Sequence, residues 1–159
     1  MADAKPTVVN VVDVIPRTGT AYLPQFAGEV RGREKRVLGE LFGLTQFGVN
    51  LTTLAPGTWS SHRHWHEAED ELVYVLEGEV VLIDEHGEHP MKAGMCAGFK
   101  AGVANAHHLV NKSARPALVL EVGTRAGDEH ARYADVDMEA TRSGGGPWRF
   151  TRKDGSPAG

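Results

Sequence analysis

The chain has 159 residues, of which 41% are hydrophobic, and its 17 basic and 21 acidic side chains leave a formal net charge of −4 at pH 7. This charge gives no general attraction to nucleic acid or to an anionic membrane surface, and no apolar run approaches the ~18 residues that a membrane-spanning helix needs. The length suits one soluble domain with a sizeable core. We therefore expect neither a nucleic-acid partner nor a membrane partner.

The first residues, MADAKPTVVNVVDVIP, contain no apolar block followed by a small-residue cleavage site, so the expected location is the cytoplasm. The single cysteine, Cys96, excludes a disulfide framework and a cysteine-rich zinc module, which leaves histidine and carboxylate as metal ligands. Cys96 lies among small residues and is expected to be buried. The basic cluster RGREKR, at residues 31–36, is expected to be a solvated loop.

Short apolar stretches, separated by single glycines and prolines, predict a series of strands with tight turns. In chain order the expected strands are RVLGELF (36–42), FGVNLTTL (47–54), SSHRHWH (60–66), ELVYVLEG (71–78), EVVLIDE (79–85), HHLVN (107–111) and ALVLEVG (117–123). This spacing indicates an antiparallel sandwich or barrel. We divide the chain into an N-terminal arm at residues 1–36, a barrel at 37–125 and a C-terminal extension at 126–159. The two extensions are expected to pack on the barrel or on a partner subunit.

The stretch SSHRHWHEAEDELVYVLEG, at residues 60–78, places three of the chain's 8 histidines at alternate positions. Successive side chains on a strand point to opposite faces, so His62, His64 and His66 are expected to share one face. Glu71 opens the next strand on the face that carries Val73 and Val75. A lone carboxylate there would be costly to bury unless a cation compensates its charge, and a divalent ion would do so.

The other face of that strand carries Leu72, Tyr74 and Leu76. Apolar side chains on both faces predict a strand that is covered on both sides, either by the second sheet or by a dimer partner. Together with the long arms and the exposed edges of an incompletely closed barrel, this pattern favours a homodimer.

Two motifs resemble the signatures of the cupin superfamily over roughly residues 37 to 123. The first is His64-Trp65-His66, then four residues, Glu71, six residues and Gly78, with Gly57 one residue further upstream than the usual glycine. The second is Gly94, five residues, Lys100-Ala101-Gly102, then His107, three residues and Asn111. In the second motif Lys100 replaces a proline, and two extra residues precede the histidine.

The resemblance implies an all-β fold, the cupin or jelly-roll barrel that is also described as a double-stranded β-helix. It further implies one divalent transition metal per chain, held by His64, His66, Glu71 and His107, with His108 as the competitor for the fourth position. Three imidazoles and one carboxylate suit Fe, Mn, Zn, Ni, Co or Cu better than Ca or Mg, and do not choose among them.

Three further residues are candidates for catalysis or substrate binding. His62 lies outside the signature, so it is expected either at the barrel mouth as an acid/base group or facing solvent. Phe99 and Lys100 precede the second motif closely enough to line the pocket, and a lysine there would suit an anionic substrate. Glu69 or Asp70 could orient a ligand histidine through its second ring nitrogen.

More narrowly, the sequence looks like small single-domain bacterial cupins that are named sugar-phosphate isomerases. On this resemblance we expect a metal-dependent enzyme that acts on a small polar or anionic metabolite. An Fe(II)-dependent dioxygenase and a non-catalytic sensor that binds a metal or small ligand are the alternatives. No helix-turn-helix segment precedes the barrel, which argues against a self-contained DNA-binding regulator.

Overall fold

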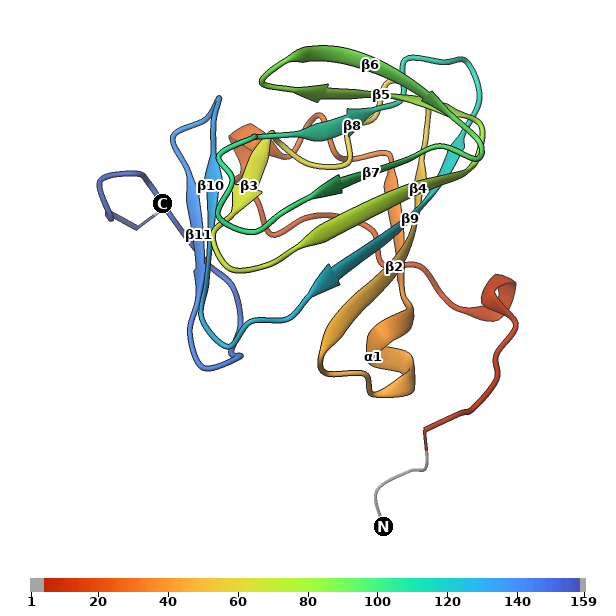
Figure 1. Cartoon of the computed structure of the whole chain (residues 1–159), viewed down its shortest axis with the longest axis horizontal. Coiled ribbons are helices and arrows are strands. Elements are labelled where there is room, and N and C mark those ends of the chain that lie inside the picture. The colour runs from red at the N-terminus through yellow and green to blue at the C-terminus, as the bar shows by residue number, and fades with distance from the viewer. Residues whose placement is uncertain (1–4, 158–159) are drawn as a thin grey trace.

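The computed structural model describes residues 5–157, which form three antiparallel sheets and little helix (Figure 1). One sheet has the strand order β1 (Arg33–Val37), β2 (Phe47–Leu54), β9 (Ala117–Thr124), β4 (Glu71–Glu77) and β7 (Cys96–Phe99). The second sheet has the order β12 (Arg149–Thr151), β11 (Glu139–Arg142), β10 (Glu129–Tyr133) and β3 (His64–His66). The third has the order β6 (Gly87–Lys92), β5 (Glu79–Asp84) and β8 (His108–Val110). The expected all-β jelly-roll architecture is confirmed.

The helical segments are the five-residue α1 (Leu38–Phe42) and two single 3-10 turns, Val11–Asp13 and Pro24–Phe26, in the arm. Within residues 5–157, no helix has the length and apolar character that a membrane span requires.

The core has two parts. The larger part lies between the five-stranded and three-stranded sheets and consists of Leu54, Val73, Val75, Val80, Leu82, Met91, Leu109, Ala117 and Val119. The smaller part lies on the four-stranded sheet, where Tyr133, Met138 and neighbouring alanines pack against Tyr22 and Phe26 from the arm and against Trp148 and Phe150 from the C-terminal segment. The described parts of the two extensions therefore pack on each other, and the pairing of β10 with β3 joins the C-terminal extension to the barrel of the same chain.

The segment at residues 33–43 differs from the prediction. Residues 33–37 form β1, an edge strand paired with β2, so the stretch expected to be a solvated loop is largely a strand. The expected strand at 36–42 is mostly the helix α1, which ends at Gly43 with a φ of 71°. Gly39 lets this helix lie close to β2, because a Cβ at that position would stand 3.1 Å from the backbone nitrogen of Val49.

The expected strand at 60–66 is confirmed only for β3, His64–His66. The backbone of residues 60–63, just before it, is bent and forms no strand. The partner of β3 is β10, which lies with β11 and β12 in the C-terminal segment where no strand was predicted. The expected strands at 47–54, 71–78, 79–85, 107–111 and 117–123 correspond to β2, β4, β5, β8 and β9, with ends that agree to within one residue.

One face of β4 is buried and the other is not. Val73 and Val75 are 3% and 0% exposed, whereas Leu72, Tyr74 and Leu76 are 44%, 37% and 40% exposed. Within the described part of the chain, the outer face therefore lacks the cover that its sequence predicts. Cys96 was expected to be buried, but it is exposed, because it lies opposite Tyr74 on β7.

Candidate metal centre

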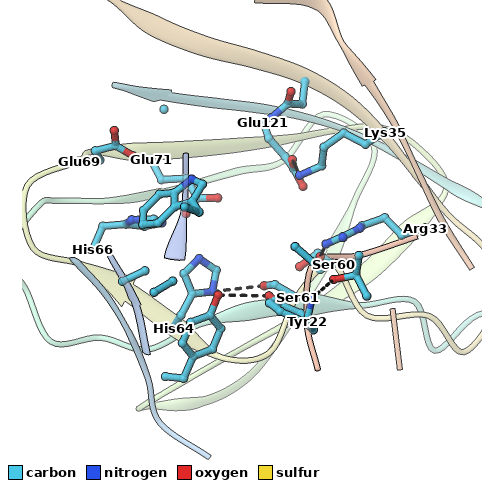
Figure 2. A pocket seen from close by; sticks show the side chains of 18 of the residues that line it. Tyr22, Arg33, Lys35, Ser60, Ser61, His64, His66, Glu69, Glu71 and Glu121 are labelled. Atoms are coloured by element: carbon cyan, nitrogen blue, oxygen red, sulfur yellow. Dashed lines mark hydrogen bonds and ion pairs between the residues drawn. The ribbon is translucent and has the colours of Figure 1, made fainter. Parts of the chain in front are cut away.

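Two histidines and one glutamate meet inside the barrel (Figure 2). His64 and His66 lie on β3 and point to the same side, as their alternate spacing predicts. Glu71 is the first residue of β4, which the chain enters after the short turn at residues 67–70. One ligand atom from each of these three residues lies within 4.8 Å of the other two, which is close enough for a single metal ion.

His107 joins this group through a backbone bridge. His64 and His107 exchange both backbone hydrogen bonds, with N···O distances of 3.2 and 3.0 Å, which connects the four-stranded sheet to the residue before β8. The Nε2 of His107 lies 3.1 Å from a carboxylate oxygen of Glu71. His108 points away, because its Nδ1 donates to the Ser61 carbonyl at 2.8 Å and its ring packs edge-on against Trp59.

Local hydrogen bonds orient the rings. The Nδ1 of His64 donates to the His62 carbonyl at 2.9 Å, and the Nδ1 of His107 donates to the Asn105 carbonyl at 2.8 Å. Both bonds leave Nε2 as the metal-facing nitrogen, which is the usual arrangement of a ligand histidine. The buried Nδ1 of His66 has no hydrogen-bond partner in the described residues.

The charges of the group match those of metal ligands. Burial lowers the pKa of His66 to about 4 and also lowers the pKa of His64, so both rings are neutral at pH 7. Burial acts to raise the pKa of Glu71, but a hydrogen bond from His107 and the positive charges of His107, His64 and His66 in their protonated forms outweigh this effect and lower it to about 2. Neutral imidazoles beside an ionised carboxylate are the form that binds a cation. The residues therefore fit the divalent transition metal that the resemblance implies.

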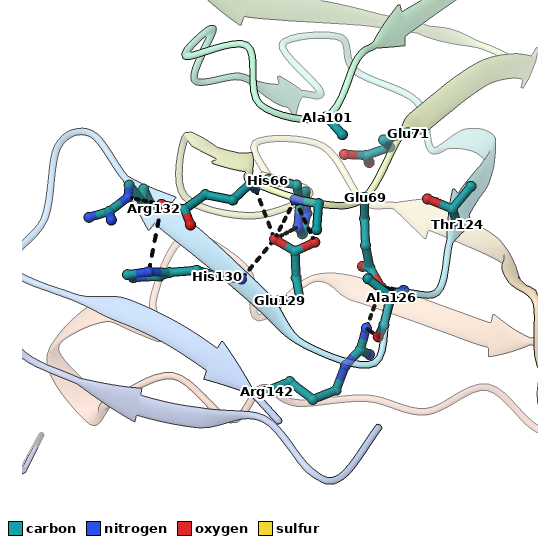
Figure 3. A network of polar contacts seen from close by, with 12 residues as sticks. His66, Glu69, Glu71, Ala101, Thr124, Ala126, Glu129, His130, Arg132 and Arg142 are labelled. Carbon is teal, nitrogen blue, oxygen red and sulfur yellow. Dashed lines mark hydrogen bonds and ion pairs between the residues drawn. The ribbon is translucent and has the colours of Figure 1, made fainter. Parts of the chain in front are cut away.

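A buried carboxylate from β10, that of Glu129, lies against the loop between β3 and β4 (Figure 3). Glu129, with a side chain that is 0% exposed, accepts hydrogen bonds from the backbone nitrogens of Glu67, Ala68 and His130, and one of its oxygens lies 3.7 Å from the Nδ1 of His66. The position beside a ligand histidine, expected for Glu69 or Asp70, is thus also occupied by Glu129. The sequence gives no local signal for this residue, since it lies 63 positions further along the chain.

Glu69 and Asp70 have other partners. Glu69 forms an ion pair with Arg142 and accepts from the backbone nitrogen of Ala126, although its carboxylate also lies close to His66 and Glu129. Asp70 accepts from the backbone nitrogen of Ala101 at 2.8 Å.

His64, His66 and Glu71 line an open cavity of about 350 Å³. Its other walls come from distant parts of the chain: Thr20 to Tyr22 from the arm, Arg33 and Lys35 from β1, Glu121 from β9, and Trp148 and Phe150 near the C-terminus. Sequence reasoning missed these residues. The one available signal was the alternation of Arg33 and Lys35, which is compatible with a strand that presents both side chains to one face.

The other predicted site residues lie in different places. His62 is only 4% exposed, so neither the barrel mouth nor solvent is its environment. Its Nε2 donates to the Phe26 carbonyl at 2.8 Å, and the ring packs among Tyr22, Phe26 and Trp59, outside the described lining of the cavity.

Phe99 stacks on His107, with ring centroids 3.3 Å apart, and lines a small inner cavity beside Glu71. The side chain of Lys100 is exposed and lines neither described cavity. The substrate-binding roles of both residues stay predictions.

Comparisons with known proteins identify the family and the fold. A family model described as a cupin domain matches residues 50–123, and no curated protein matches the chain. Among solved structures, a sugar phosphate isomerase of the cupin superfamily from Silicibacter pomeroyi is 45% identical over 96% of both chains, with a TM-score of 0.90.

A protein from Acidithiobacillus ferrooxidans, provisionally named a sugar phosphate isomerase, is 30% identical over 77% of both chains, with a TM-score of 0.70. The polyketide cyclase RemF from Streptomyces resistomycificus shares the fold, with a TM-score of 0.63 and 21% identity over 82% of this chain and 87% of its own. On the motifs, the metal-ligand geometry and this similarity, the chain belongs to the cupin superfamily.

Proposed function

We propose that this cupin is a metal-dependent enzyme that isomerises a small polar or anionic metabolite of the sugar phosphate type. The observation that carries the proposal is the group of His64, His66 and Glu71 at an open cavity, with His107 in contact with Glu71. Metal sites with open positions in lined cavities commonly serve catalysis. The name of the 45% identical relative supports the isomerase assignment.

The cavity residues have distinct tasks in such a reaction. His64, His66, Glu71 and His107 would hold the ion, which when bound would act as a Lewis acid on a substrate oxygen. An isomerisation moves a proton between neighbouring carbons, so it needs a group that accepts the proton from one carbon and returns it to the next. We assign this task to the carboxylate of Glu121, which lines the cavity and lies 2.8 Å from the Nζ of Lys35.

Tyr22, Trp148 and Phe150 form an aromatic wall of the cavity. His62, the acid/base candidate from the sequence, is held by the Phe26 carbonyl outside this lining.

The first experiment is elemental analysis of protein purified without an affinity tag or added metal. We expect about one transition metal per chain in the wild type and loss of the metal in the double variant His64→Ala/His66→Ala. His86→Ala is the matched control, because His86 is exposed in the turn between β5 and β6. Metal-free wild-type protein that also fails to take up added ions would contradict the proposal.

The second experiment is a screen of aldose and ketose phosphates in deuterated water by proton NMR. We expect interconversion of one pair with deuterium incorporated at the carbon that exchanges its proton. Glu121→Gln should keep its metal and lose turnover by about 100-fold or more. Oxygen consumption by an iron-loaded protein would instead favour a dioxygenase. Ligand binding without turnover would favour a sensor.

A further inference from the structure

Two cationic side chains of β1 reach the cavity. Arg33 and Lys35 occupy alternate positions on this edge strand and both line the cavity, whereas Glu34 between them is exposed. Arg36 also lies outside the lining, and its Nε donates to the Val14 carbonyl at 2.9 Å. The strand therefore presents one of its faces, with two positive charges, to the site.

The two cations differ in their partners. Lys35 forms an ion pair with Glu121, with a distance of 2.8 Å between Nζ and the carboxylate oxygen, so together these side chains carry no net charge. Arg33 donates to two backbone carbonyls, those of Ser60 and Gly19, and within residues 5–157 it forms no ion pair. Among the described residues, the hydrogen-bond acceptors of the half-buried Arg33 guanidinium are therefore backbone carbonyls.

A guanidinium group has five N–H donors, so the two carbonyl bonds leave donors unused. A partly buried charge without a counter-charge is unfavourable, and an anion that entered the cavity would remove this cost. Arginine suits carboxylate and phosphate groups in particular, because its planar fork can donate two parallel hydrogen bonds. The positive charge of Arg33 also affects Tyr22 in the aromatic wall. Burial raises the pKa of Tyr22, and the charge of Arg33 acts in the opposite direction.

The position of Arg33 relative to the metal ligands defines how a ligand would lie. Figure 2 shows Arg33 and Lys35 on one side of the cavity and His66 and Glu71 on the opposite side. A cavity of about 350 Å³ has room for a small metabolite that spans the two sides.

We infer that Arg33 forms an anion-binding subsite that takes the phosphate or carboxylate group of the substrate. This inference rests on the proposed function, since it assigns the charged end of the substrate to Arg33 and the reacting end to the metal ligands.

The test is a calorimetric titration of metal-loaded protein with inorganic phosphate and, separately, with malonate. We expect Arg33→Met to weaken the binding of the preferred anion by about tenfold or more, in line with the strength of a charged hydrogen bond. Arg33→Lys keeps the charge without the fork and is expected to show an intermediate loss. Arg31→Met is the matched control, because Arg31 is exposed two residues before Arg33 and lies outside the lining.

Phosphate and malonate distinguish a phosphate-binding subsite from a carboxylate-binding one, because the anion with the higher affinity identifies the group that the subsite prefers. Equal anion affinity in the wild type and in a folded Arg33→Met variant would overturn the inference. A wild type that binds neither anion would also overturn it. So would an Arg31→Met variant that loses as much anion affinity as Arg33→Met. Melting temperature and metal content, measured on each variant, show whether a loss comes from unfolding or from the metal site. If Arg33 controls anion binding but no isomerisation is found, the proposed reaction falls and the subsite stands.

Discussion

Two adjacent histidines, His107 and His108, lie on opposite sides of one short segment. The Nε2 of His107 faces Glu71, whereas His108 donates to the Ser61 carbonyl and packs on Trp59. We therefore expect His107→Ala to weaken metal binding by about 100-fold or more, as the loss of a ligand does, and His108→Ala to leave it within a fewfold of the wild type. Competition with a chromophoric chelator measures both affinities. A larger loss of metal affinity in His108→Ala than in His107→Ala would show that His108, and not His107, is the ligand.

Glu129 is expected to position the ring of His66. Its carboxylate is 3.7 Å from the Nδ1 of that ring, which has no hydrogen-bond partner within residues 5–157, and is fixed by three backbone nitrogens. Outer carboxylates of this kind typically contribute about 10- to 100-fold to metal affinity. We expect a loss of this size in Glu129→Gln and little change in Glu67→Gln, the exposed carboxylate of the same loop.

The unfolding temperature of the metal-free Glu129→Gln variant, measured beside the affinity, separates positioning from stability. A variant that is destabilised but binds metal with wild-type affinity would show that Glu129 only anchors the loop at residues 67–68.

The sequence predicts the centre of the site and misses its walls, for a physical reason. His64, His66 and Glu71 lie within eight residues, so strand alternation alone brings two of them to one face. His62 follows the same spacing but fails to join them, because the backbone bends before His64. The residues of the cavity wall and Glu129 reach the site through contacts between segments that are distant in the sequence. The spacing of residues along the chain does not reveal such contacts.

At the level of elements, the pairing of β3 with β10 is reinforced by an ion pair. Arg63, just before β3, donates two hydrogen bonds of 2.7 Å to Asp135, just after β10, and these bonds lower the pKa of Asp135. The Asp135 side chain is 52% exposed, so solvent and salt weaken the pair, and we expect it to contribute about 0.2–1 kcal/mol to the free energy of unfolding.

This contribution has a defined pH dependence. Because the folded pKa of Asp135 lies below its unfolded value of about 3.9, the stabilisation is complete above that pH and is lost as the pH falls through the folded pKa. Urea denaturation of the wild type and Asp135→Asn should therefore differ at pH 7 and converge in acid. A difference that grows on acidification would contradict this assignment.

Strands and helices were predicted best where the local sequence carries a clear strand pattern or turn signal. β2 has the predicted bounds, since the strand ends at Leu54, just before the turn signal Pro56-Gly57. The helix α1 was missed because LGELF is too short to show a helical period, and its form depends on Gly43 and on packing against β2. β10, β11 and β12 are polar strands, which form because β3 offers an edge for pairing.

At the level of the molecule, we propose that a second copy covers the outer face of the five-stranded sheet. Leu72, Tyr74 and Leu76 form an exposed apolar row on β4. The arm carries further apolar side chains without cover, Val8, Val12 and Ile15, which are 84%, 75% and 88% exposed. Apolar surface of this extent on a sheet and on an arm commonly marks a contact between subunits.

We expect light scattering to give a mass of twice 17.2 kDa for the wild type. The double variant Leu72→Lys/Leu76→Lys should be a monomer, because two charges would have to be buried at the contact. Val103→Lys is the matched control, an exposed apolar residue outside this row. A monomeric wild type would remove the proposal.

The backbone bridge between His64 and His107 places the metal centre where the three sheets meet. His64 belongs to the four-stranded sheet, Glu71 to the five-stranded sheet, and His107 immediately precedes the edge strand of the third. One ion held by all three would act as a cross-link where the sheets meet, in a protein that has no disulfide to do so. Chelation should therefore accelerate amide hydrogen exchange at His64 and His107 before it affects β2 and β9, and unchanged exchange there would show that the sheets hold together without the ion. The ion would then set the order in which the barrel opens.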